Sequence, residues 1–437
     1  MPSPSASPRS PDSASGNARI ALGLLTAAYV LSFVDRSIVA LMVGPIRADL
    51  GISDTQFSLL GGLAFALFYT TLGIPLGWWA DRGDRPKIIA LGIALWSLMT
   101  MACGLATRFA TLFAARVGVG VGEAALSPAA YSLIAETYPK ERLGGALTIY
   151  SSGVYLGIGL SFVAGGYLVE TLQSAPPVDF GPLGELAGWQ QVFIIAGAPG
   201  LLIAPLVLLF LPESRRRGPA AEASRSPPIM GWMAQHKTFL AAHFFGFSML
   251  TMAFNGYLAW QAEFLLRTYE LPKSEGGLWV GLAVLFAGVG GMLVGGRISD
   301  RLLTKGDRAG ALSAAVVACA LLVPFAAMTP LVPGAMFSLL LFAPTVFFSA
   351  FCFGPAVIAL QLATPERLRA RVSAVYLLVV NLTGIGLGGT LVAWISDSIL
   401  GGDGMRIGEA MAVVGGAAAV IALPLLITAR VRMPEHG

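Results

Sequence analysis

The sequence predicts an all-α polytopic membrane protein with twelve transmembrane helices, arranged as two repeats of six. Hydrophobic residues make up 56% of the 437 residues and charged residues only 12%, whereas soluble proteins carry roughly 25% charged residues. The mean hydropathy is +0.75. The 53 glycines suit helices that pack closely inside a membrane. These values exclude an ordinary soluble protein.

Twelve apolar stretches are each long enough to cross the roughly 30 Å of hydrocarbon in a bilayer. They begin near Arg19, Phe57, Lys87, Thr111, Leu143, Trp189, Lys237, Leu278, Ala309, Pro333, Val372 and Ile407. The expected organisation is a disordered tail rich in Ser and Pro (1–18), a first six-helix bundle (19–211), a polar linker (212–235), a second six-helix bundle (236–430) and a short tail (431–437).

The distribution of basic residues predicts the orientation. Most of the 28 Lys and Arg residues fall on the side that holds both predicted termini, and the opposite side receives only Arg47, Arg108, Arg267, Lys273 and Arg406. By the positive-inside rule both termini are cytoplasmic. The net charge of +4 then belongs to the loops, and no nucleic-acid partner is expected.

Two motifs occur once in each half, in the same order. GWWADR at 77–82 recurs as GRISDR at 296–301, and PAAYSLIAETYPKER at 128–142 resembles PAVIALQLATPER at 355–367. Parallel six-helix repeats place a binding site between the halves, near the middle of the membrane. The repeats therefore predict a carrier that works by alternating access.

The first predicted helix carries two charges, Asp35 and Arg36, inside an otherwise apolar run at 20–43. A charge at this depth costs roughly 2.5–3.5 kcal/mol on insertion scales, so it is expected to face a bundle interior or a wet cavity. In the fourth predicted helix, Arg116 and Glu123 are seven residues apart, which places both on one face, about 10 Å from each other. We expect these four residues to form one network. The alternatives are a self-neutralising Asp35–Arg36 pair and a Glu123 that is permanently locked for structure.

The segment GWWADRGDRPK at 77–87 resembles the signature loop of the major facilitator superfamily, and Arg116 followed by Gly120 resembles its fourth-helix pattern. The resemblance implies the major facilitator fold. It also implies a charged clasp that latches and releases the cytoplasmic side. The predicted clasp residues are Gly77, Asp81, Arg82 and Arg85 in the first copy, and Asp300 and Arg301 in the second. A solvated cluster that only sets topology is the alternative.

Within the superfamily, FVDRSIVALMVGPIRADLGISDTQFSLLGGLAFALFY at 33–69 closely resembles the spinster family. That resemblance implies a bacterial inner-membrane carrier of sphingosine-1-phosphate-like lipids or lysophospholipids, driven by the proton gradient without a bound cofactor. Asp35 and Glu123 would carry the proton, and Arg36 and Arg116 would receive the anionic head group. The repeat aligns Phe254-Asn255 with Asp35-Arg36. An apolar wall with a polar handle is therefore expected in the second half, from Phe254, Asn255, Tyr257 and Phe351.

Other functions stay open at this point. One alternative is a multidrug or small organic-anion exporter on the same fold, and another is a non-transporting membrane sensor or a scramblase. An enzyme is not expected, because no nucleophile–base set or nucleotide-binding loop is recognisable. The cysteines Cys103, Cys319 and Cys352 lie apart in apolar stretches, so no metal site is expected. The predicted partners are membrane lipids and the transported anion, and the predicted state is a monomer.

Overall fold

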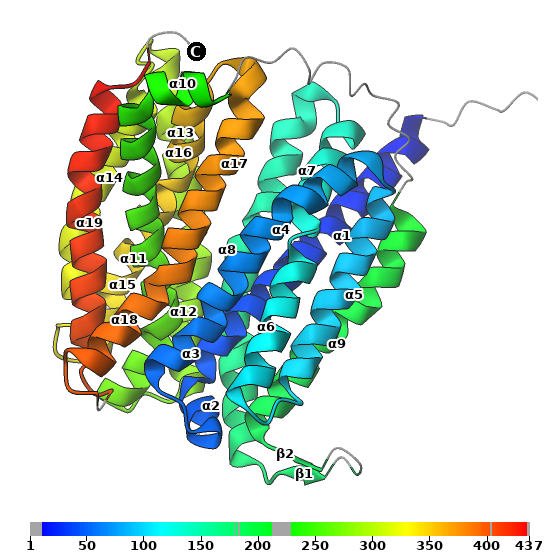
Figure 1. The fold of residues 1–437 in the computed structure, drawn as a ribbon, viewed down its shortest axis with the longest axis vertical. Helices are drawn as coiled ribbons and strands as arrows, with labels where there is room; N and C mark the ends of the chain where they lie inside the picture. Colours follow the sequence, from blue (N-terminus) through cyan, green and yellow to red (C-terminus); the bar gives the residue numbers. More distant parts are fainter. Residues whose placement is uncertain (1–10, 180, 182–183, 212–228, 403, 435–437) are drawn as a thin grey trace, which may run out of the picture.

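The computed structural model describes residues 11–179, 181, 184–211, 229–402 and 404–434, and it is almost entirely helical (Figure 1). The first half contains α1 (Pro11–Ser37), the 3₁₀ turn η1 (Ile38–Leu41), α2 (Val43–Leu50), α3 (Asp54–Gly61), α4 (Leu63–Arg82), α5 (Arg85–Cys103), α6 (Phe109–Glu123), α7 (Leu126–Thr137), α8 (Lys140–Ser174), α9 (Gly188–Phe210) and an antiparallel hairpin of β1 (Val178–Asp179) and β2 (Glu185–Leu186).

The second half begins with a short helix in the predicted linker and then repeats the pattern of long apolar helices. It contains α10 (Ile229–Gln235), α11 (Lys237–Tyr269), α12 (Lys273–Ala283), the π turn η4 (Val284–Gly288), α13 (Val289–Thr304), α14 (Gly310–Met328), α15 (Ala335–Phe351), α16 (Phe353–Ala363), the 3₁₀ turn η5 (Glu366–Leu368), α17 (Arg369–Val380), the π turn η6 (Asn381–Ile385), α18 (Gly386–Ser398) and α19 (Ile407–Val431).

The prediction of twelve membrane-spanning helices is confirmed. In the described part of the chain, twelve helical stretches are long and apolar enough to cross a membrane, and each begins within a few residues of its predicted start. Helix α1 begins at Pro11, earlier than the predicted bundle boundary at residue 19. Residues 1–10 of the predicted tail and 212–228 of the predicted linker lie outside the described residues.

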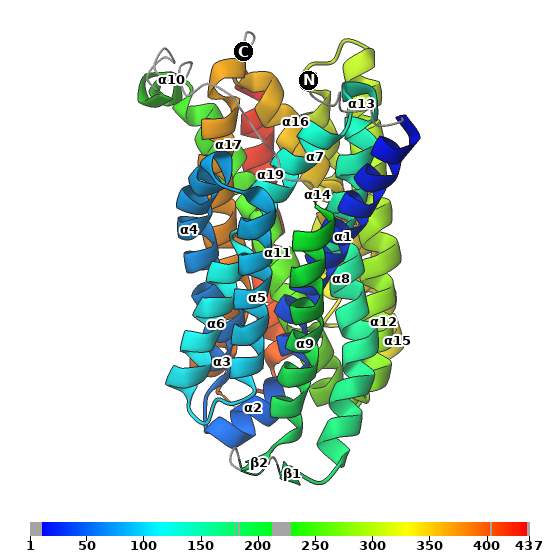
Figure 2. The ribbon, with the colours of Figure 1, turned by 90° about the vertical axis from the view of Figure 1, so that its right-hand side faces the viewer.

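The two halves stand side by side with their helices roughly parallel (Figures 1 and 2). The start of α1 and the end of α19 lie at one end of the bundle, here named the terminal side. The β1–β2 hairpin, α2 and α3 lie at the other end, here named the hairpin side. In Figure 1 the ribbons of the two halves converge toward the hairpin side and diverge toward the terminal side.

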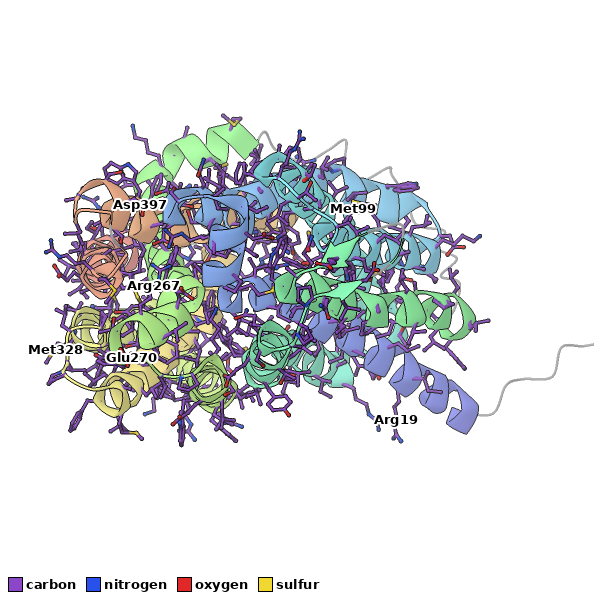
Figure 3. The ribbon with its side chains drawn as sticks, turned by 90° about the horizontal axis from the view of Figure 1, so that it is seen from below. Arg19, Met99, Arg267, Glu270, Met328 and Asp397 are labelled. Atoms are coloured by element: carbon purple, nitrogen blue, oxygen red, sulfur yellow. The ribbon has the colours of Figure 1, made fainter. Side chains whose placement is uncertain are left out.

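Hydrogen bonds and ion pairs join the two halves on the hairpin side. The joined pairs are Asp54 with Arg267, Leu41 with Lys273, Thr55 with Asp397, and Glu170 with Ser274. Figure 3 views this end and labels Arg267 and Asp397, which lie beside the segment that includes α2 and α3. This structure is therefore closed on the hairpin side.

Glycines bring α8 and α12 into direct contact across the same interface. A Cβ atom added to Gly277 of α12 would lie 2.5 Å from the carbonyl oxygen of Phe162, and one added to Gly281 would lie 2.7 Å from that of Gly159. Small residues allow this approach of two backbones in a membrane. The contact fixes the two halves against each other between the charged pairs and the middle of the bundle.

Candidate functional site

Asp35 lies inside the first bundle, 2% exposed, in the last turn of α1. Thr100 of α5 donates its hydroxyl to Asp35 Oδ2 at 3.2 Å. The guanidinium of Arg116 is fully buried and donates to two main-chain oxygens, that of Asp35 at 3.4 Å and that of Leu60 at 3.3 Å. Arg116 therefore holds the backbone that carries the charged pair, and it stands beside the Asp35 carboxylate without a direct ion pair.

Arg36 forms the ion pair of the site with Glu123, the last residue of α6. Its Nη2 lies 2.5 Å from Glu123 Oε2, and the two side chains are 13% and 1% exposed. The pair joins α1 to α6 within the first half. Among the described contacts there is no ion pair between Asp35 and Arg36, and none between Arg116 and Glu123. The ion pair of the network joins Arg36 to Glu123 instead.

Three aromatic rings surround the guanidinium of Arg36. Its Cζ lies 4.0 Å from the ring centre of Phe65, 4.5 Å from that of Phe33 and 5.0 Å from that of Tyr69. The rings come from α1 and α4, and each provides a cation–π contact that stabilises the charge within the bundle. We name Phe33, Phe65 and Tyr69 the aromatic cradle.

Several polar atoms of this network have no hydrogen-bond partner among the described residues. They are Asp35 Oδ1, Glu123 Oε1, Arg36 Nε and Arg116 Nη2. An unsatisfied buried oxygen on a carboxylate is costly, typically by about 1–3 kcal/mol or more. Protonating the carboxylate removes the charge that makes this burial costly. A proton on Glu123 would also leave the Arg36 guanidinium without its carboxylate partner.

The predicted residues of the second half are mostly directed into their own bundle. The Tyr257 hydroxyl donates to the carbonyl of Ala326 in α14. Phe351 is 6% exposed within the core of the second bundle. Phe254 meets Phe353 edge to face at 6.0 Å. Among the predicted substrate-binding residues of this half, Asn255 alone is partly exposed, and its amide donates to the Thr251 carbonyl at 2.9 Å. Their role in substrate binding stays a prediction.

The predicted clasp on the terminal side is described in part. Gly77, Asp81 and Arg82 belong to the end of α4, and the surroundings of these three residues lie outside the described part of the structure. Arg85 is 2% exposed and pairs with Glu136 of α7 at 2.7 Å, within the first half. Asp300 and Arg301 are exposed near the end of α13. The gating role of these residues stays a prediction.

The end of this loop starts helix α5. Asp84 caps α5, accepting from the Lys87 amide at 3.4 Å. Pro86 follows in the first turn of α5, where a proline costs no hydrogen bond. Asp84 and Pro86 thus start the third membrane helix.

Sequence reasoning missed Thr100 and the aromatic cradle. Phe33 precedes Arg36 by three residues on one helix, a spacing that places side chains together and could have predicted the contact. Phe65 and Thr100 come from other helices, so only the packing of the bundle reveals them.

The Major Facilitator Superfamily model matches residues 25–389. An MFS-type efflux pump from Mycolicibacterium smegmatis is 31% identical over 382 residues, which cover 87% of this chain and 84% of that protein. The bovine protein spinster homolog 1 is 28% identical over 319 residues, and the match spans 57% of its length.

Solved structures agree with these relatives. A bacterial homologue of the human lysosomal transporter spinster, solved in an inward-facing and occupied conformation, matches with a TM-score of 0.76 and 27% identity over 94% of this chain and 95% of that one. The inward-facing and unoccupied form of a bacterial spinster homologue matches with a TM-score of 0.77 and 26% identity over 95% of this chain and 96% of that one. The chain therefore belongs to the Major Facilitator Superfamily of membrane transporters, and within it resembles the spinster proteins.

Proposed function

We propose that this transporter moves an amphiphilic anion, of the lysophospholipid or sphingosine-1-phosphate type, in exchange or symport with protons. The terminal side faces the cytoplasm in this proposal, in agreement with the loop charges. Residues 19–211 and 236–430 rock against each other to open the substrate site to either side. The hairpin side is closed by contacts between the halves, so substrate reaches Arg36 from the terminal side in this conformation.

The ion pair between Arg36 and Glu123 is the observation that carries the proposal. It joins a partly exposed cation, toward the end of the membrane span Ala18–Leu41, to an enclosed carboxylate midway along the span Phe109–Thr137, at 2.5 Å. A permanent structural pair would not need one partner to remain accessible. An accessible arginine at this depth is instead suited to bind phosphate or carboxylate.

The Glu123 carboxylate and the substrate would compete for the same arginine. When Glu123 is ionised it occupies Arg36, and when it is protonated the guanidinium becomes available to the anionic head group. Asp35 would act as the second titrating group, since its Oδ1 has no partner among the described residues. Because Arg36 binds either the Glu123 carboxylate or the cargo, transport of the cargo depends on the proton gradient.

The aromatic cradle supports an amphiphilic rather than a purely polar cargo. Phe33 and Phe65 place apolar surface directly against the cation that would bind the head group. Asn255 of the opposite half is partly exposed and supplies an amide. A head group on Arg36 with a tail along apolar side chains fits the general pattern of binding sites that are mostly apolar with a few polar anchors.

Transport by the reconstituted protein tests the proposal. Purified protein is reconstituted into liposomes, and uptake of lysophosphatidylglycerol is measured with and without an imposed proton gradient. We expect gradient-dependent uptake by the wild type and by the exposed-carboxylate control Glu275→Gln. Uptake by Glu123→Gln and Asp35→Asn should lose its dependence on the gradient. Gradient-dependent uptake that survives in both site variants refutes the coupling role.

A small organic anion is the second candidate substrate. A probable L-galactonate transporter from Escherichia coli is 26% identical over 332 aligned residues, which cover 73% of this chain and 69% of that protein, and the same Arg36 could bind a sugar carboxylate. A competition assay distinguishes the two candidate substrates. A lysophospholipid substrate is displaced increasingly well as the competing acyl chain lengthens, whereas a sugar-acid substrate is displaced by short hydroxy acids and is insensitive to chain length.

A further inference from the structure

The segment that follows the charged pair of α1 contains a carbonyl that its own helix cannot satisfy. Helix α1 ends at Ser37, continues as the 3₁₀ turn η1 and resumes as α2 at Val43. In a continuous α-helix the carbonyl of Leu41 would accept from the amide four residues later. That residue is Pro45, which has no N–H. Leu41 is fully buried, so its carbonyl needs another donor.

Lys273, the first residue of α12 in the opposite half, supplies that donor. Its Nζ lies 2.7 Å from the carbonyl oxygen of Leu41, and its side chain is 7% exposed. The Oε2 atom of Glu263 lies 3.7 Å from Nζ, too far for a hydrogen bond. The buried ammonium therefore makes its short contact with the main chain of the other half, and Glu263 compensates its charge from a distance.

The backbone of Lys273 is itself held in place. A Cβ atom added to Gly166 of α8 would lie 2.6 Å from the Lys273 carbonyl oxygen, so α8 packs directly against this residue. The next amide, that of Ser274, donates to Glu170 of α8 at 2.8 Å. The backbone of Lys273 is thus packed against α8 of the first half, while its ammonium contacts the Leu41 carbonyl of the same half.

We propose that Lys273 is a positioning residue that couples closure of the hairpin side to the Arg36–Glu123 pair. Leu41 lies five residues after Arg36, which corresponds to about 8–10 Å of helix rise. A 3₁₀ stretch within a helix often marks a hinge. While Lys273 holds Leu41, the break in α1 is fixed and Arg36 faces Glu123. When the halves separate on the hairpin side, the ammonium leaves the carbonyl, and η1 can turn and move Arg36 relative to α6.

This coupling rests on the proposed role of Arg36 and Glu123 in transport, but the contact of Lys273 can be tested without substrate. Spin labels are attached at Thr107 and Ile399, exposed residues of the two halves on the hairpin side, in full-length protein whose three buried cysteines are replaced by alanine. Pulsed electron paramagnetic resonance in lipid nanodiscs then gives the fraction of molecules with separated halves.

The variants differ in whether position 273 offers a donor. Lys273→Met keeps the length of the side chain and loses the donor, so the ratio of separated to closed molecules should rise about tenfold or more, as expected for one charged hydrogen bond. Lys273→Arg should retain most of the closed population. Lys237→Met, at the exposed lysine that begins α11 on the terminal side, should match the wild type. An unaltered distance distribution in Lys273→Met overturns the proposal.

A double-mutant cycle tests the coupling itself. Glu123→Gln is measured with Lys273 present and with Lys273→Met, and the change in the separated fraction is compared between the two backgrounds. A smaller effect of Glu123→Gln in the Lys273→Met background supports coupling through η1, and equal effects in both backgrounds refute it. If lysophospholipid uptake proves insensitive to Glu123→Gln while the cycle is non-additive, the proposed function fails and the positioning role stands.

Discussion

Asp54→Asn is expected to open the hairpin side of the transporter. Asp54 is fully buried and accepts from Arg267 of the opposite half at 2.7 and 2.9 Å, and from Arg47 of its own half at 2.9 Å. The amide keeps the shape of the carboxylate and removes its charge. Two arginines from different halves would then face each other across a neutral group.

The size of the effect follows from the remaining charges. Breaking a buried ion pair by removing one partner typically costs about 3–5 kcal/mol. Glu263 still accepts from Arg267 Nε at 2.9 Å and offsets part of this loss, so we expect about 2–3 kcal/mol. The closed population would fall relative to the open one by about 30- to 150-fold.

The distance between spin labels at Thr107 and Ile399 measures this shift directly. The control is Glu275→Gln, an exposed carboxylate on the same side of the molecule, which should leave the distribution unchanged because exposed charges contribute little. If Asp54→Asn retains the wild-type distribution, the ion pairs on the hairpin side do not hold the halves together.

Two other substitutions, each paired with a control substitution, test individual contacts by thermal unfolding in detergent. Gly277→Ala would bring a methyl group to 2.5 Å from a carbonyl of α8, whereas nothing lies within 4 Å of the corresponding atom at Gly296. We expect Gly277→Ala to lower stability by about 1–3 kcal/mol and Gly296→Ala to have no such effect, and equal melting temperatures would contradict the close contact. Arg85→Gln breaks a pair with Glu136 in which the arginine is 2% exposed and should cost about 2 kcal/mol. Lys87→Gln, at a side chain that is 69% exposed, should cost less than about 1 kcal/mol, and a larger loss there than at Arg85 would refute this ranking.

The sequence was sufficient to predict the membrane fold, because apolar runs of membrane length and a repeated loop motif depend on local composition alone. It also predicted that Asp35, Arg36, Arg116 and Glu123 lie together, since charges inside apolar helices must find one another. Their pairing could not be read from spacing. It depends on the rotation of α1 against α6, and that rotation directs Arg36 to Glu123 and Arg116 to main-chain oxygens.

The aromatic residues of the second half show the same limit. Tyr257 and Phe351 lie on largely apolar helices, so the sequence does not say which face meets the other half. The structure directs the Tyr257 hydroxyl to Ala326 within its own bundle. Arg267 and Lys273 were predicted only as loop charges, and their partners in the other half are more than 200 residues away in sequence. The signal that could have found Lys273 is Pro45, which leaves the Leu41 carbonyl without a helical donor.

Competition between the Glu123 carboxylate and the cargo for Arg36 is the central claim, and the affinity for lysophosphatidylglycerol as a function of pH tests it most directly. This probe suits the measurement because its phosphodiester keeps one negative charge throughout the range. In the wild type the affinity should rise as the pH is lowered, since a protonated Glu123 releases Arg36. In Glu123→Gln it should be high at every pH. A pH dependence that is the same in both proteins would contradict the account.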